Sequence, residues 1–350
     1  MDCFAGHGGQ FEPPNHQTTM STYQSQEFLF RRIKELLPPD KSMVDFTAEI
    51  LHISSDSAYR RIRGETPIVL DEARELCQYF KLSLDHVLNV KGGSTLFRDV
   101  RVNVRDYDYA QYLQDLLKQL KWVGSFIHKE IIYRTKDMPL FHNFYFEPVI
   151  AFRYFFWMHT IIEDPNFKTR GFEMNCVSPD IIELSRELNR AYNEIPSIEI
   201  WNTECVNAAI SQIEFYKESG YFSSAADIRT IYEALEETFV HLKHQVDRGC
   251  KFMPDESPEN RKNNFTFFYN RVVLGDNTIL VVTDNAKTIF LNYDTLNYIS
   301  TRDEEFCNRS YDDLQRLIKR STIISETSER QRNIFFGIML NRIKERKANL

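Results

Sequence analysis

The feature that most constrains this chain is a series of short helical patterns that follow one another closely between Gln24 and Val90. Apolar residues recur at helical spacing within each pattern, and residues that end helices, such as Pro38, Pro39 and Gly64, stand between the patterns. We therefore expect a compact helical domain over residues 23–91.

Residue composition suggests how this domain is bounded. Residues 1–22 are rich in Gly, Pro, Asn and Thr and lack periodicity, which predicts a disordered tail. The run Lys91–Ser94 has the composition of a hinge. The predicted helices cover Gln24–Leu37, Ser42–Leu51, Ser54–Arg63 and Asp71–Phe80, with a short fifth helix after Ser83.

The third of these helices carries the most information about function. Ser54 is a good N-cap, because its hydroxyl can accept a hydrogen bond from a free backbone N–H. Ala58 and Ile62 lie four residues apart and are expected to face inward. The small residue Ala48 on the second helix allows the third to cross it closely. The side chains left mainly on the outside are Ser55, Ser57, Tyr59, Arg60, Arg61 and Arg63.

This pattern is what a helix needs to read the major groove of DNA. Small hydroxyl residues at the N-terminus let the helix enter the groove, and arginines farther along reach guanine edges or phosphates. The free N–H groups at the helix start also favour phosphate. The predicted DNA-binding residues are Ser54, Ser55, Ser57, Tyr59, Arg60, Arg61 and Arg63.

An alternative is that the three arginines form an ordinary solvated face, paired with Asp56, Glu65 and Glu72. The net charge of the chain is -7, so it is not a generally basic nucleic-acid coat. DNA binding would have to come from a local basic face and would be modest in nonspecific affinity and sensitive to salt.

Residues 24–90 resemble the helix-turn-helix domains of lambda-repressor-like (Cro-type) regulators. The matching frame is Ala48, Leu51, Ile53, Ser54, Arg60 and Gly64, followed by Leu76–Phe80 and Leu82–Asp85. The run Ser57–Glu65 is similar to a version found in regulators from Bacteroides-type bacteria. The resemblance implies a five-helix DNA-binding domain. One departure is His52, which stands where the family often has glycine in the turn.

Residues 95–350 predict a larger, mainly helical domain. Fainter resemblance to the companion region of the same regulators lies in Lys136–His142, Phe155–Trp157 and Lys319–Ser325. The predicted helices cover Tyr107–Ile127, Pro148–Asp164, Ser178–Asn193, Glu199–Ser219, Ser223–Arg248, Tyr311–Arg320 and Glu326–Lys347. Short strands are expected at Phe97–Asn103 and Glu130–Arg134, and a small antiparallel β-meander at about 265–293. The fold class is thus mainly α, or α+β.

The segment Phe141–Trp157 is unusually aromatic. It predicts either an ordinary core or an effector pocket for a small molecule or peptide, lined by Phe141, His142, Phe152, Phe156 and Trp157. The same domain is expected to form a homodimer, because one helix-turn-helix unit contacts only one half-site of DNA.

No motif in the chain indicates catalysis, and we predict no catalytic residues, no metal site and no cofactor. His241 and His244 are three residues apart on a predicted helix, but no third ligand is nearby in the sequence. The six cysteines are scattered, which suits reduced thiols in the cytoplasm. Neither a signal peptide nor a membrane span is predicted.

Together these features predict a cytoplasmic, sequence-specific transcriptional regulator that binds double-stranded DNA. The first alternative is a non-enzymatic adaptor that uses its helical domains to bind other proteins. A further alternative is an enzyme fused to a DNA-targeting head.

Overall fold

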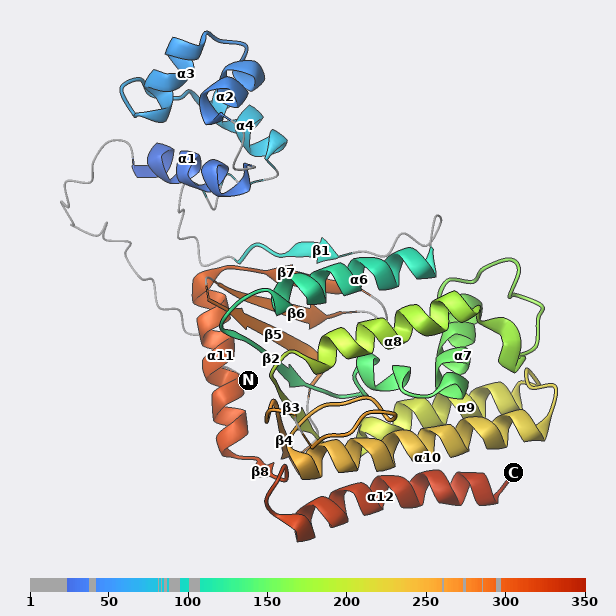
Figure 1. The fold of residues 1–350 in the computed structure, drawn as a ribbon. Coiled ribbons are helices and arrows are strands. Elements are labelled where there is room, and N and C mark those ends of the chain that lie inside the picture. Colours follow the sequence, from blue (N-terminus) through green and yellow to red (C-terminus); the bar gives the residue numbers. More distant parts are fainter. Residues whose placement is uncertain are drawn as a thin grey trace, which may run out of the picture. The chain divides into compact units, whose positions relative to one another are not determined.

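The computed structural model describes residues 24–37, 42–80, 82, 84, 87, 95–100, 108–259, 261–272, 275–284, 286–293 and 297–350. Its contacts divide the chain into Met1–Ser94, here called unit 1, and Thr95–Leu350, here called unit 2. The chain as a whole is α+β, with helices in both units and a sheet in unit 2 (Figure 1).

Unit 1 consists of helices in the residues that the structure describes. They are α1 (Gln24–Leu36), α2 (Met43–Leu51), α3 (Ser55–Ile62) and α4 (Leu70–Tyr79). These match the first four predicted helices to within about a residue at each end, because the capping residues that mark them are local features of the sequence. The tail, the hinge and the predicted fifth helix lie outside the described residues or almost entirely so.

The apolar faces of these helices meet in one small core. Leu29, Ile33 and Leu76 are completely buried there, with Phe30, Leu51, Cys77 and Val87 close behind. Ala58 of α3 is also completely buried. The core thus receives the inward side of α3 and leaves its opposite side free.

Unit 2 is built around one eight-stranded mixed sheet with the order β1-β7-β6-β5-β2-β3-β4-β8. The strands are β1 (Arg98–Val100), β2 (Lys129–Arg134), β3 (Ser197–Trp201), β4 (Phe265–Tyr269), β5 (Thr278–Thr283), β6 (Lys287–Asn292), β7 (Tyr298–Thr301) and β8 (Thr322–Ile323). Strands β2, β3 and β4 run parallel to one another, and the remaining pairs are antiparallel.

Helices cover both faces of this sheet (Figure 1). One face packs into the large core with α6 (Tyr109–Gly124), α7 (Glu147–Phe156), α8 (Pro179–Asn193), α9 (Asn207–Glu218), α10 (Ala225–Arg248) and α12 (Glu329–Ala348). The other face packs against α11 (Glu304–Lys319), through Cys307 and Leu314 on Ile132, Ile200 and Leu280. Because β2 is covered on both sides, its Ile131, Ile132 and Tyr133 are all buried.

Two predictions for unit 2 are wrong in part. The predicted helix Glu199–Ser219 begins as strand β3, passes through a 3-10 turn at Thr203–Val206 and becomes helical only in α9. The predicted meander at about 265–293 is wrong for its first strand only. β5 and β6 pair antiparallel, but β4 does not pair with β5: it lies parallel to β3 on one side and antiparallel to β8 on the other. Both errors come from pairing between strands distant in sequence, which periodicity does not reveal.

Candidate nucleic-acid interface

Helix α3 begins and ends as its sequence requires. The Ser54 hydroxyl accepts a hydrogen bond from the Ser57 N–H at 3.3 Å and caps the helix. The chain leaves the helix through Gly64, whose φ of 75° is in the left-handed region that favours glycine. A short, well-bounded helix therefore stands on the surface of unit 1.

The exposed side of α3 carries most of the predicted contact residues. Ser54 and Ser55 at its start are exposed, and Tyr59 is 45% exposed. The side chains of Arg60 and Arg63 are 55% and 58% exposed. Ser57 is half-buried, and its hydroxyl is 3.0 Å from that of Ser54. Five of the seven predicted residues thus form one polar, exposed surface along the helix, which we call the α3 surface.

Arg61 differs from the other arginines because it turns back into the unit. Its side chain is only 18% exposed and forms a two-pronged ion pair with Glu72 of α4, with Nε–Oε2 at 3.0 Å and Nη2–Oε1 at 2.8 Å. Its Nη1 also donates to the Ser57 carbonyl at 3.2 Å. Arg61 therefore fastens α3 to α4 in this structure, as the alternative interpretation of the arginines expected for this residue.

The α3 surface also meets acidic side chains. Glu65 lies 4.0 Å from the Arg60 Nε and 3.5 Å from the Arg63 Nε, both through its carboxylate oxygens. Since all three side chains are half or more exposed, water screens these pairs and they hold the arginines only weakly. Arg63 also donates to the Tyr59 hydroxyl at 2.9 Å.

Gln26 of α1 was missed by the sequence reasoning. Its side chain is 7% exposed. Its Nε2 donates to the carbonyls of Arg61 at 2.6 Å and Thr66 at 2.9 Å, and its Oε1 accepts from the Ile68 N–H at 3.0 Å. Three bonds from one buried amide fix the end of α3 and the loop that follows it. A polar residue within the apolar pattern of α1 was the available signal.

The turn between α2 and α3 contains a residue other than glycine in the left-handed conformation. His52 adopts the left-handed conformation, with φ 54° and ψ 41°, and caps α2 by donating its N–H toward the carbonyls of Ala48 and Glu49. The next residue, Ile53, donates to the Ala48 carbonyl at 3.0 Å. The fold therefore keeps the turn geometry that glycine would adopt and accepts the cost of a side chain there.

Comparison of the chain with protein-family models, curated proteins and solved structures finds no match. A role for unit 1 must therefore be inferred from the residues and geometry of α3.

The predicted effector-pocket residues of unit 2 lie in its large core. His142 is completely buried and Phe152 is 2% exposed, while Phe141, Phe156 and Trp157 are 6% to 7% exposed. Their rings contact other core rings, such as Phe141 stacked on Tyr192 with centroids 4.0 Å apart. These side chains pack as the core interpretation of the aromatic segment expected.

A buried polar cluster lies in that core, around Glu199 of β3. Its carboxylate accepts hydrogen bonds from the Tyr192 hydroxyl at 2.6 Å and the Trp201 Nε1 at 2.8 Å, and His142 Nε2 lies 3.0 Å from both oxygens. Burial raises the pKa of Glu199, but the charge and hydrogen bonds of His142 and Tyr192 outweigh it, so the net pKa is lowered. We call these four residues the Glu199 cluster.

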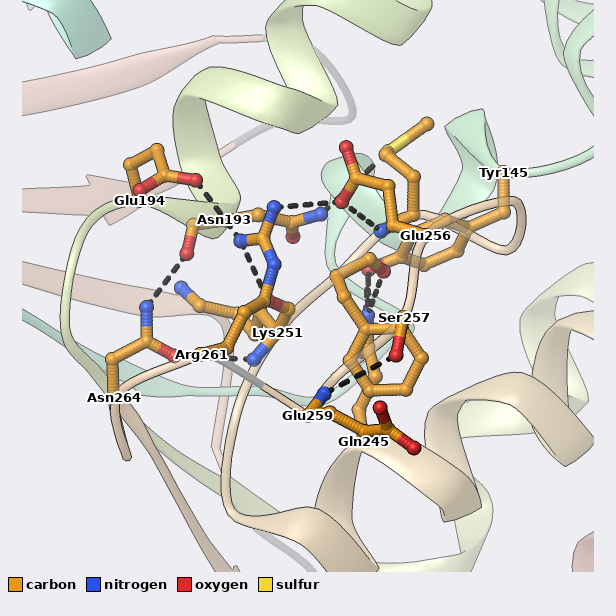
Figure 2. Close-up of polar contacts among 12 residues, drawn as sticks. Tyr145, Asn193, Glu194, Gln245, Lys251, Glu256, Ser257, Glu259, Arg261 and Asn264 are labelled. Carbon is orange, nitrogen blue, oxygen red and sulfur yellow. Dashed lines mark hydrogen bonds and ion pairs between the residues drawn. The ribbon is translucent and has the colours of Figure 1, made fainter.

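Lys251 lies beside this cluster and is also completely buried. Its Nζ donates to the carbonyl of Tyr192 in the last turn of α8, at 2.9 Å, and to that of Ile195 just past the helix, at 2.7 Å. Burial lowers the pKa of Lys251 to about 7. Lys251 lies on the chain between α10 and β4. Figure 2 shows Arg261 of the same segment, which forms ion pairs with Glu194 at 2.9 Å and Glu256 at 2.6 Å.

The side chains of Lys251 and Arg261 hold the fold together, because their hydrogen bonds go to other groups of the protein. The Lys251 ammonium satisfies carbonyls at the end of α8, and Arg261 also donates to the Lys251 carbonyl at 3.0 Å. Within the described part of the chain, no group of three or more His, Cys, Asp or Glu side chains is placed to hold a metal ion. His241, one of the two histidines noted in the sequence, has its Nε2 2.9 Å from the Phe252 carbonyl. None of the described helices is both long and apolar enough to cross a membrane.

Proposed function

We propose that unit 1 binds double-stranded DNA by placing α3 in the major groove, and that the chain is a sequence-specific transcriptional regulator. The observation that carries this proposal is the α3 surface, which presents Ser54, Ser55, Tyr59, Arg60 and Arg63 to solvent on one short helix. A helix of this kind, with small hydroxyl residues first and arginines later, is suited to entering a groove end-first.

The supports behind α3 strengthen the proposal. A helix that reads base edges must be held rigidly, since small displacements break paired hydrogen bonds. Arg61 joins α3 to α4 through Glu72, and Gln26 joins its end to α1. We therefore assign Arg61 and Gln26 to positioning the helix, and Arg60 and Tyr59 to base contacts. Arg63 and the N-terminal serines suit phosphate contacts.

The test is selection of DNA from a random duplex pool, followed by affinity measurements on the enriched sequence. Arg60→Ala is expected to cost about 1–3 kcal/mol of binding and to relax preference at one position, if Arg60 contacts a guanine edge. Arg63→Ala is expected to weaken all sequences alike and to make the salt dependence shallower. The matched control is Arg74→Ala, which removes an exposed arginine from α4.

No enriched sequence, or equal losses for Arg60→Ala and Arg74→Ala, would contradict the assignment. Either result would favour the second candidate, a protein-binding adaptor. The observation in its favour is that Val69 and Leu70, at the start of α4, are 59% and 70% exposed. Large exposed apolar side chains side by side suit a protein contact.

We also propose that unit 2 forms the dimer through the outer face of α12. Phe335, Phe336 and Met339 on its inner face are completely buried, yet Ile334 and Ile338 on the other side are 46% and 36% exposed. Gly337 lies between them, and a Cβ there would meet nothing within 4 Å. Glycine inside a helix costs about 1 kcal/mol relative to alanine, which close approach of a second helix would offset.

Ile334→Glu combined with Ile338→Glu is expected to give a monomer in light scattering and to weaken DNA binding at least tenfold, because two half-sites would no longer be bound together. The control is Ile127→Glu, since Ile127 is 86% exposed on another part of unit 2. A wild-type chain that is already monomeric would refute the dimer and leave the DNA assignment of α3 standing.

A further inference from the structure

A cavity of about 430 Å³ opens in unit 2 near the carboxyl ends of β2 and β4, where the end of α11 meets β8. Its walls include Arg134, Arg271 and Arg320, together with Asn270, Leu317 and Thr322. Its volume is in the range of small-molecule sites. In sheets with parallel strands, ligands bind beyond the carboxyl ends of those strands, which is where this cavity lies.

Charge is the distinctive property of this cavity. Three arginines line it, and none of its described lining residues is an Asp or Glu. Arg271 and Arg320 are exposed and have no ion pair within the described part of the chain. By contrast, Arg316 of the same helix α11 is paired with Asp313. Two of the three guanidinium groups are therefore available to an outside anion.

Arg134 differs from these two because it is held in place. Its Nη2 donates to the Thr278 hydroxyl at 2.7 Å and to the Asp276 carbonyl at 3.1 Å. Its Nε is buried and has no hydrogen-bond partner. Burial lowers the pKa of the Arg134 guanidinium, so an anion beside it would stabilise the charged form. An unsatisfied buried donor on a fixed arginine is the kind of group that a ligand completes.

The surrounding backbone also keeps the cavity in shape. Asn270, only 4% exposed, donates from Nδ2 to the Ser321 hydroxyl at 2.9 Å and accepts at Oδ1 from the Val272 N–H at 2.8 Å. These bonds tie the turn after β4 to the end of α11. That end contributes about half a negative charge. Asp276 and Asp313 also act on Arg134 from outside the lining, whereas the lining itself carries three full positive charges.

We propose that this cavity binds a small molecule carrying phosphate groups, with Arg134, Arg271 and Arg320 as its ligands. The planar guanidinium matches phosphate oxygens in pairs, and three such groups suit more than the single charge of one carboxylate. A diphosphate satisfies all three arginines better than a single phosphate does. The concave shape and limited volume favour a small ligand over the backbone of duplex DNA.

The experiment is calorimetric titration of the full chain with pyrophosphate. Saturable binding is expected, with inorganic phosphate and citrate both weaker. The variant with Arg271→Gln and Arg320→Gln is expected to bind pyrophosphate at least tenfold more weakly, because each substitution removes a charge-assisted hydrogen bond to the ligand. The matched control carries Arg316→Gln and Lys319→Gln. It also removes two positive charges, both from α11, and leaves every residue that lines the cavity unchanged.

Three results would overturn the proposal: no saturable heat with the wild-type chain, equal weakening in the two double variants, or tighter binding of citrate than of pyrophosphate. Both pairs of residues are exposed, so thermal midpoints without ligand should agree and confirm that the variants fold. The titration contains no DNA. A failure of the α3 assignment therefore leaves it unaffected, and the reverse also holds.

Discussion

The α3 surface of unit 1 and the Glu199 cluster of unit 2 use polar residues in opposite ways. In unit 1 the α3 surface places its polar side chains in water, with Arg60 and Arg63 more than half exposed. In unit 2 the Glu199 cluster and Lys251 are completely or almost completely buried. An exposed polar residue can be replaced at little cost to stability, whereas a buried one is coupled to folding. The first arrangement therefore leaves residues free to serve binding, and the second ties them to the fold.

The largest test of this difference is Glu199→Ala. It leaves the donors of Tyr192, Trp201 and His142 unsatisfied in the core, and breaking such a buried charged network costs about 3–5 kcal/mol. Denaturant unfolding followed by tryptophan fluorescence measures it cleanly, because Trp122, Trp157 and Trp201 are the only tryptophans of the chain and all lie in unit 2.

The control for this variant is Glu233→Ala, which removes an exposed carboxylate from α10. It is expected to change stability by less than about 0.5 kcal/mol. Similar losses for the two variants would show that the Glu199 cluster does not support the core, and the contrast between the units would then fail.

A second test uses pH and Lys251. Its pKa is about 7 in the folded chain, against 10.5 for an ordinary lysine. Between these two pKa values the unfolded chain binds more protons than the folded one, so the stability of the fold rises as pH increases through this window. Below pH 7 the lysine is charged in both states, and the fold bears the full cost of burying that charge. The neutral amine keeps two N–H donors, enough for the carbonyls of Tyr192 and Ile195.

Between pH 7 and pH 9 this linkage amounts to about 2 kcal/mol of added stability. The same fluorescence measurement on Lys251→Met, which cannot titrate at this position, isolates the lysine. We expect the wild-type chain to gain about 2 kcal/mol more than the variant over this range. Equal gains would mean that Lys251 is charged in the folded chain at both pH values.

Within unit 1, the features that depend on neighbouring residues could be predicted from the sequence, and those that depend on distant residues could not. The bounds of α3 follow from Ser54 and Gly64, and its buried side from Ala58, all within a few residues. The orientation of Arg61 does not follow, because its partner Glu72 lies eleven residues away on another helix. From the sequence alone, Glu72 was one of three acidic residues that could pair with the arginines.

Unit 2 was harder because its contacts join distant segments. The last three residues of β3 were predicted as the start of a helix. Yet Pro196 precedes the strand, and Ile198 and Ile200 alternate with the polar residues Ser197 and Glu199 in the manner of a strand. Its place between β2 and β4 depends on pairing across more than sixty residues on each side, as in Ile131 with Ser197 and Ser197 with Phe265. The Glu199 cluster exists only once those strands and η2 (Leu140–Phe144) come together.

The smallest predicted effect belongs to His52 and sharpens the contrast within unit 1. A side chain in the left-handed conformation costs about 1 kcal/mol, which glycine avoids. Glycine gives back part of this gain through the greater freedom of the unfolded chain. His52→Gly is therefore expected to stabilise the α2–α3 pair by about 0.5 kcal/mol, seen as slower hydrogen exchange of amides in α2 and α3 of the full chain.

His52→Ala keeps the Cβ atom and should not slow this exchange. If both variants slow it equally, the imidazole and not the backbone conformation is the source of the cost. Both His52 variants should bind DNA with nearly unchanged affinity, since His52 lies before α3 and the α3 surface does not include it.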